Sequence, residues 1–338
     1  MRRFQWICSG AISTAISSIC DAIQAMPKNH KDNKKVFDTV FEHSLEEIYD
    51  GWTDWRTDLL LALVPLCHDT ENRKLLENFL STPENNSLSE WSRDFDYRQK
   101  QMLQHQLIKQ YDSEALAQGF IEQNLDNIDF RCIAIKHNIA NKDYEKAITL
   151  CIEGEAGNIQ YPGIIKNLQE LRYTAYEAAG NIPKQKELAL TLLLGGDFAY
   201  FLKYKELHSK KEWDPVFNDV LNKAEKRNSR GVYVEILVHE KHKPRLLAYC
   251  KINPSAIASY YTHLLPEYIQ EVGELFSAFI KYKAESADNR GHYQDVCELI
   301  KICDKACPGA TSLVCSEIIE KYARRPAFMD EMQKIGKL

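Results

Sequence analysis

The feature that most constrains this chain is a turn that recurs between helical stretches. Lys142-Asp143-Tyr144 separates two amphipathic segments, and Gly180-Asn181-Ile182 separates the next two. The turns lie about 38 residues apart, a separation typical of repeats built from paired helices. Because one such pair cannot bury its apolar face alone, the spacing predicts stacked helix pairs between residues 131 and 189.

Two later segments match the same turn, namely Lys241-His242-Lys243 and Gly291-His292-Tyr293. Their separations widen to about 60 and about 50 residues, which predicts an irregular array with inserted helices. We therefore expect an all-α fold, specifically an irregular α-solenoid of tetratricopeptide-like helix pairs.

Composition supports the helical class. Only 14 Gly and 11 Pro occur in 338 residues, too few for the many turns of an all-β protein. A 44% hydrophobic and 27% charged composition is ordinary for a soluble globular chain. The polar run at residues 81–86 is the strongest break, so we predict an N-terminal helical segment, 1–82, and a repeat array, 83–338, possibly continuous with it.

Compartment and bulk charge give broader expectations. The formal charge of −5 provides no global attraction to nucleic acid or to an anionic membrane. No stretch approaches the 18 or more apolar residues of a membrane span, so no membrane contact is expected. Ten scattered cysteines are compatible with a reducing compartment, which favours the cytoplasm.

Three clusters resemble chemical sites but have a simpler interpretation. Four cysteines lie within 19 residues, but only Cys303 and Cys307 have the close spacing of metal ligands, so all four are predicted to be core residues: Cys297, Cys303, Cys307 and Cys315. His239 and His242 lie at a predicted turn and lack the spacing of a zinc-binding helix. Arg290 and His292 resemble a nuclease pair, but His292 occupies the place of Asp143 in the earlier turn, so a helix cap is predicted there. We therefore predict no catalytic residue, cofactor or metal.

Several short matches occur in one order along the chain. They are Tyr161-Pro162-Gly163, Gly195-Gly196-Asp197, Glu212-Trp213, Asn289-Arg290 with Tyr293, and Arg324-Arg325-Pro326. Through these matches the chain resembles the helical C-terminal region of bacterial SWIM zinc-finger family proteins. The resemblance extends from about Phe41 to the end of the chain. The resemblance implies a tetratricopeptide-like solenoid. The C-x-C and C-x-H pairs of the zinc finger are absent, so no zinc-finger function is expected.

The leading functional hypothesis is a scaffold that binds an unknown protein or peptide on a surface of stacked helices. Tyrosine and arginine are enriched at such contacts. The predicted surface is Arg172, Tyr173, Tyr176, Tyr200 and Tyr204. A basic run between residues 200 and 245 leaves a nucleic-acid-associated module as an alternative, although acidic residues are interleaved with it. An enzyme with an unrecognised composite site is the remaining alternative.

Overall fold

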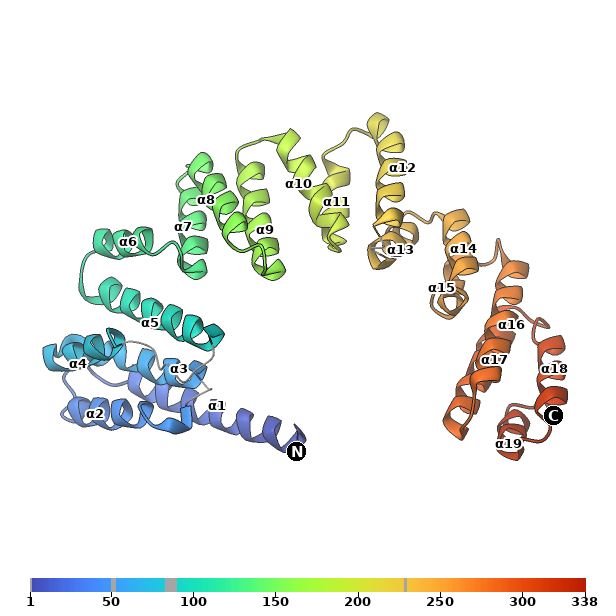
Figure 1. Ribbon diagram of the computed structural model, residues 1–338, viewed down its shortest axis with the longest axis horizontal. Helices are drawn as coiled ribbons and strands as arrows, with labels where there is room; N and C mark the ends of the chain where they lie inside the picture. The colour runs from blue at the N-terminus through green and yellow to red at the C-terminus, as the bar shows by residue number, and fades with distance from the viewer. Residues whose placement is uncertain (1, 50–52, 83–89, 228–229) are drawn as a thin grey trace. The chain divides into compact units, whose positions relative to one another are not determined.

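The computed structural model describes residues 2–49, 53–82, 90–227 and 230–338. Every regular element within these ranges is helical, so the prediction of an all-α fold is confirmed (Figure 1). No helix in the described ranges is both long and apolar enough to span a membrane. The chain forms two compact units, residues 1–185 and 186–338, and each is described by itself.

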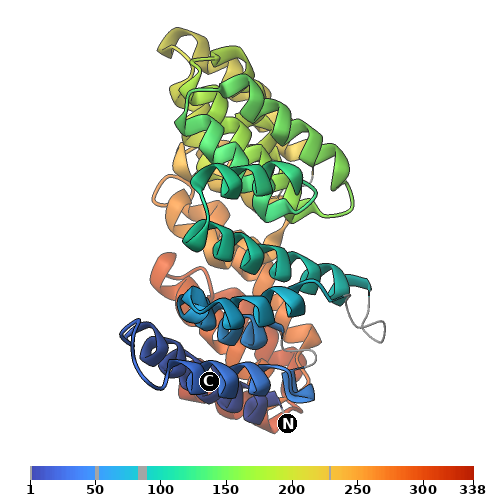
Figure 2. The same cartoon turned by 90° about the vertical axis from the view of Figure 1, so that its left-hand side faces the viewer.

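The first unit begins with helices that surround a common core. Its helices are α1 (Arg2–Gln24), α2 (Asn33–Ser44), α3 (Thr53–Leu63), α4 (Thr70–Leu80), α5 (Glu90–Tyr111), α6 (Glu114–Gln123), α7 (Ile128–Ala140), α8 (Tyr144–Gly157) and α9 (Pro162–Ala178), with short 3₁₀ helices at Glu47–Tyr49 and Val64–His68. Phe37, Leu63 and Leu76 are fully buried among α2, α3 and α4. Figure 2 shows α5 between α4 and α6, both of which it contacts.

The predicted boundary between residues 82 and 83 does not separate the compact units. Residues 83–89, just beyond the predicted boundary at residue 82, lie outside the described part of the chain. Helix α5, which follows them, packs against α3 and α4, which precede them. Helices on both sides of the predicted boundary therefore belong to the first unit. The border between the two compact units lies instead within α10 (Ile182–Leu194).

The recurring turn predicted from the sequence has the same backbone geometry at three of its four positions. Lys142, Gly180 and Lys241 all have left-handed backbone, with φ of 64°, 67° and 54°. At each turn the next residue's N–H closes the helix, as in the 2.9 Å bond from Asp143 N to Asn138 O. Asp143 then caps α8 by accepting a hydrogen bond from the N–H of Lys146 at 3.2 Å. The turn at Lys142 joins α7 to α8 and the turn at Lys241 joins α13 (Arg230–His239) to α14 (Lys243–Ile252), and the two helices of each pair are in contact.

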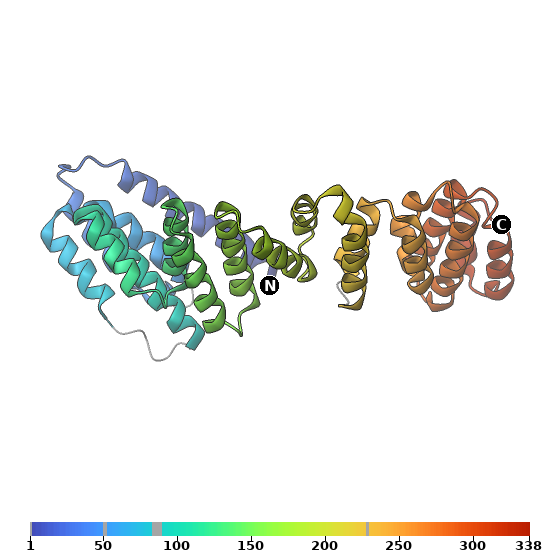
Figure 3. The ribbon, with the colours of Figure 1, turned by 90° about the horizontal axis from the view of Figure 1, so that it is seen from above.

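The second unit contains the remaining helices. They are most of α10, then α11 (Ala199–Glu206), α12 (Lys210–Lys226), α13 (Arg230–His239), α14 (Lys243–Ile252), α15 (Ile257–Leu264), α16 (Ile269–Ser286), α17 (Arg290–Ala306), α18 (Ser312–Tyr322) and α19 (Pro326–Lys334), with a 3₁₀ helix at Pro254–Ala256. Figure 3 shows α16 to α19, coloured orange to red, gathered near the C-terminus. Helix α16 contacts α17 and α18, and α17 contacts α19.

The fourth predicted turn is wrong. Gly291 and His292 lie inside the first turn of α17 rather than between helices. The cap is Asn289, whose side-chain oxygen accepts the N–H of His292 at 3.1 Å. Asn289 therefore starts the helix three residues earlier than the predicted cap at His292.

A buried histidine gives the first unit a pH-sensitive core. The imidazole of His105 is 6% exposed, lies 5.5 Å from the ring of Phe130, and its Nδ1 has no hydrogen-bond partner among the described residues. Burial, helped by Lys109 and opposed by Glu114, lowers the pKa of His105 from its ordinary 6.5. The unfolded chain therefore binds this proton more readily than the folded chain.

We expect the first unit to lose stability as the pH falls below about 6.5, because protonation of His105 then favours unfolding. His105→Leu should flatten the dependence of unfolding free energy on pH between about 7 and 5, measured by chemical denaturation. The same change at exposed His137 is the control and should leave the parent slope. An equal slope in the parent and the His105 variant would contradict this assignment.

Candidate functional site

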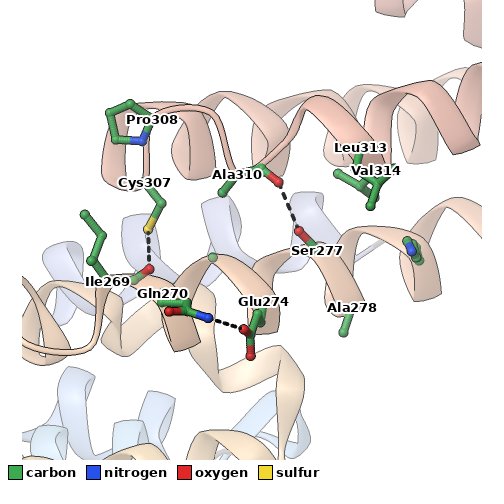
Figure 4. A pocket seen from close by; sticks show the side chains of 12 residues that line it. Ile269, Gln270, Glu274, Ser277, Ala278, Cys307, Pro308, Ala310, Leu313 and Val314 are labelled. Atoms are coloured by element: carbon green, nitrogen blue, oxygen red, sulfur yellow. Dashed lines mark hydrogen bonds between the residues drawn. The ribbon is translucent and has the colours of Figure 1, made fainter.

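A groove of about 700 Å³ lies in the second unit. One wall is a continuous stripe of α16, and the other is the turn between α17 and α18 with the first turn of α18 (Figure 4). The lining residues are Ile269, Gln270, Gly273, Glu274, Ser277, Ala278, Lys281, Cys307, Pro308, Ala310, Leu313 and Val314. We define these residues as the α16–α18 groove.

Small side chains bring the two walls together at the floor of the groove. A Cβ added to Gly273 would lie 3.0 Å from the Cβ of Ala310, closer than side chains normally approach. Ser277 donates a hydrogen bond from its hydroxyl to the carbonyl of Ala310 at 3.3 Å. The turn itself needs Gly309, whose φ of 85° disfavours any residue with a side chain.

The exposed parts of the groove are mainly apolar. Leu313 is 71% exposed and Ile269 is 47% exposed, although both are large aliphatic side chains. Exposed apolar side chains gathered in a concave site are typical of binding surfaces. The groove can therefore bury a partner's apolar side chains.

The polar groups of the groove already have partners within the chain. The Gln270 amide donates to Glu274 at 3.1 Å, and the Cys307 thiol donates to the carbonyl of Ile269 at 3.4 Å (Figure 4). Lys281 forms an ion pair with Glu317 of α18. Burial raises the pKa of the Cys307 thiol, so this sulfur is a poor nucleophile at neutral pH.

A second, smaller hollow of about 370 Å³ lies in the first unit. Two of its lining residues, Tyr97 and Asn127, belong to a polar network in which Gln101 donates to Tyr97 at 3.0 Å and to Asn124 at 2.8 Å. Asn127 in turn donates to the oxygen of Gln101 at 2.8 Å. These groups satisfy one another within the chain, and the hollow has about half the volume of the α16–α18 groove.

The tyrosines of the predicted partner surface are buried. Tyr173 and Tyr176 of α9 are 2% and 6% exposed, and Tyr200 and Tyr204 of α11 are 5% and 8% exposed. The Tyr173 hydroxyl accepts a hydrogen bond from Gln185 at 3.2 Å. The sequence did not indicate which of these rings face inward; the structure places all four in the core, where they pack helices together.

Arg172, the fifth predicted contact, forms an ion pair inside the first unit. Its Nε lies 2.8 Å from Glu155 Oε1, and its Nη2 donates to Oε2 at 2.9 Å. Both side chains are less than one-fifth exposed. Burial raises the pKa of Glu155, and the Arg172 guanidinium opposes that rise. The guanidinium therefore joins α9 to α8 rather than pointing freely to solvent.

The four C-terminal cysteines are core residues, as predicted. Each is at most 5% exposed. Burial raises the pKa of Cys297 to about 11 and that of Cys303 to about 12. In the described ranges, no group of three or more His, Cys, Asp or Glu side chains is arranged to hold a metal ion.

The histidine pair lies at a turn between two helices. His239 ends α13 and His242 precedes α14, so they flank a turn as predicted.

Several cations of the basic run between residues 200 and 245 are paired with acids: Lys223 with Asp219, Lys205 with Glu240, Lys243 with Glu267, and Arg245 with Glu225. Much of that positive charge is therefore balanced locally.

The groove was missed because residues that meet across it are distant in the chain, such as Gly273 and Ala310, which are 37 residues apart. The available signal was a second stripe on α16, where small residues at Gly273, Ser277 and Ala278 lie between polar positions. Such small residues also occur where helices pack closely or face solvent, so the stripe alone does not specify a groove.

Comparison with known proteins identifies no relative. No family model matches the chain, no curated protein matches it, and no solved structure matches it.

Proposed function

We propose that this chain is a scaffold that binds a protein or peptide and has no catalytic activity of its own. The observation that carries the proposal is the α16–α18 groove, an apolar concavity of about 700 Å³ with a 71% exposed leucine at its rim. Peptide-binding sites of helical proteins bury apolar anchors in such grooves. Because the polar groups of the groove already form hydrogen bonds or ion pairs within the chain, the groove is better suited to binding a partner than to catalysing a reaction.

The same proposal assigns the helices to an irregular α-solenoid of tetratricopeptide-like pairs. Support comes from the recurring left-handed turn and from α8, which contacts both α7 and α9. Kinship with the helical region of bacterial SWIM zinc-finger family proteins rests on the sequence resemblance alone. A cytoplasmic location is part of the proposal, because the described cysteines are all free thiols.

A nucleic-acid-associated role is the second candidate but receives less support. Its basis is the basic run of residues 200–245, in which Lys205 and Lys223 bond to Glu240 and Asp219 at 2.7 and 2.6 Å. A phosphate backbone would have to displace these carboxylates. Protein binding therefore remains the leading proposal.

A groove-specific crosslink tests the function. We expect a photoreactive amino acid at position 313 to capture a protein partner from a bacterial lysate, and Ala278→Arg to reduce that capture about tenfold. Position 116 is the matched control, because Leu116 is also an exposed leucine, at 61%, but lies in the first unit. Equal capture from positions 313 and 116, unaffected by Ala278→Arg, would overturn the proposal.

A further inference from the structure

We infer that the occupant of the α16–α18 groove is an amphipathic α-helix of a partner protein with a basic residue beside its apolar stripe. The inference rests on the proposed binding function and adds the conformation and charge of the ligand.

Hydrogen-bonding capacity decides between a helix and an extended peptide. An extended peptide exposes backbone N–H and C=O groups that need partners when buried. The α16 wall is a helix, whose backbone groups are bonded internally. In the opposite wall the Ala310 N–H donates to the carbonyl of Cys307 at 3.0 Å, and the Ala310 carbonyl accepts from the Ser277 hydroxyl at 3.3 Å. The Gln270 amide is likewise already bonded within the chain. A helix satisfies its own backbone and asks the groove only for apolar contact.

The length of the groove fits a short helix. Its α16 wall runs from Ile269 to Lys281, which spans about 18 Å at about 1.5 Å per residue. A ligand helix of three to four turns matches this length and would present apolar residues at positions i, i+4, i+7 and i+11. The small floor residues Gly273, Ala278 and Ala310 leave room for large aliphatic side chains between the walls.

Charge at the rim favours a basic partner. Glu274 is an exposed carboxylate whose described bond is to a neutral amide, that of Gln270. The one cation of the lining, Lys281, is already paired with Glu317. A lysine or arginine on the ligand helix, placed next to its apolar stripe, would therefore meet Glu274 without a competing cation.

Synthetic peptides test this inference on the full chain. The helical probe is a fluorescein-labelled, alanine-rich 16-residue peptide with leucines at positions i, i+4, i+7 and i+11 and two flanking lysines. One comparison peptide has the same composition with the leucines spread around the helix. A second keeps the leucines in place but replaces two central alanines by proline, which prevents helix formation.

We expect fluorescence anisotropy to show the helical probe binding about tenfold more tightly than either comparison peptide. Leu313→Glu and Ala278→Arg should each weaken that binding about tenfold, whereas the control Leu116→Glu should not. Glu274→Lys should weaken the lysine probe and strengthen a version in which glutamates replace the lysines.

The alternative outcomes separate the inference from the proposed function. If the proline peptide binds best and Leu313→Glu weakens it, the groove binds peptides in extended form and only the helix inference falls. If the glutamate version binds the parent chain more tightly, the charge assignment falls. If the parent chain forms a dimer that Leu313→Glu dissociates, the occupant is a second copy of this chain. If no peptide binds and the position-313 crosslink captures nothing, both proposals fall.

Discussion

Replacing Phe130 by alanine is expected to lower the unfolding free energy of the first unit by about 3 to 5 kcal/mol. The ring is fully buried on α7 and meets the rings of His105 at 5.5 Å and Phe120 at 5.7 Å. Its loss leaves a cavity that the helices around it cannot fill without moving. Chemical denaturation should report the loss, and hydrogen exchange should place it in the first unit.

Phe130→Leu keeps most of the volume and should cost less than the alanine variant. Leu116→Ala is the exposed control and should change stability by no more than about 0.5 kcal/mol. If Phe130→Ala costs no more than Leu116→Ala, the ring is not a core residue.

Replacing Arg172 by methionine is the second large expected effect, a loss of about 2 to 4 kcal/mol. The substitution leaves the Glu155 carboxylate, 16% exposed, without the guanidinium that now lies 2.8 Å away. Burial already raises the pKa of Glu155, and removal of Arg172 should raise it further. The folded chain then takes up a proton more readily than the unfolded chain.

This pKa shift gives the Arg172 variant a characteristic pH dependence. Because the folded pKa of Glu155 exceeds its unfolded value, stability is lost as the pH rises through the folded pKa. The deficit of Arg172→Met relative to the parent should therefore be largest near pH 7 and shrink towards pH 5. The double variant Arg172→Met with Glu155→Leu should recover most of the loss, since no buried charge remains. A double variant as unstable as the single variant would contradict the ion-pair explanation.

Residues beside the Arg172–Glu155 ion pair contribute to the stability of the first unit. Tyr173 and Tyr176 are buried beside Arg172, so substitutions at these positions should act first through stability. Loss of partner capture in such variants would not identify a contact surface unless folding is shown to be intact.

The helical class and the main turns were predictable because they depend on local chemistry. The pattern at Lys142, Gly180 and Lys241 repeats a left-handed helix end, a conformation specified within about six residues. The pattern at Gly291 failed for an equally local reason: Asn289 is a stronger cap than the predicted His292 and starts α17 earlier.

Burial and the groove depend on contacts between distant segments, which the pattern of one helix does not specify. Tyr200 and Tyr204 share one face of the short helix α11, and nothing within α11 indicates that other helices cover it. Likewise, Gly273 becomes part of a groove only because Ala310, 37 residues later, lies against it. Small residues on a helix are compatible with close packing, with an open hollow or with plain solvent exposure.

The extensive helix contacts within each unit join neighbours along the chain or next-but-one neighbours, such as α7 with α8 and α17 with α19. Closing a short loop costs little chain entropy, so contacts of this kind form rapidly. During synthesis, each helix emerging from the ribosome can therefore pack on the one or two before it, without waiting for the C-terminal residues. A translational pause after α9 would leave most of the first unit already able to assemble.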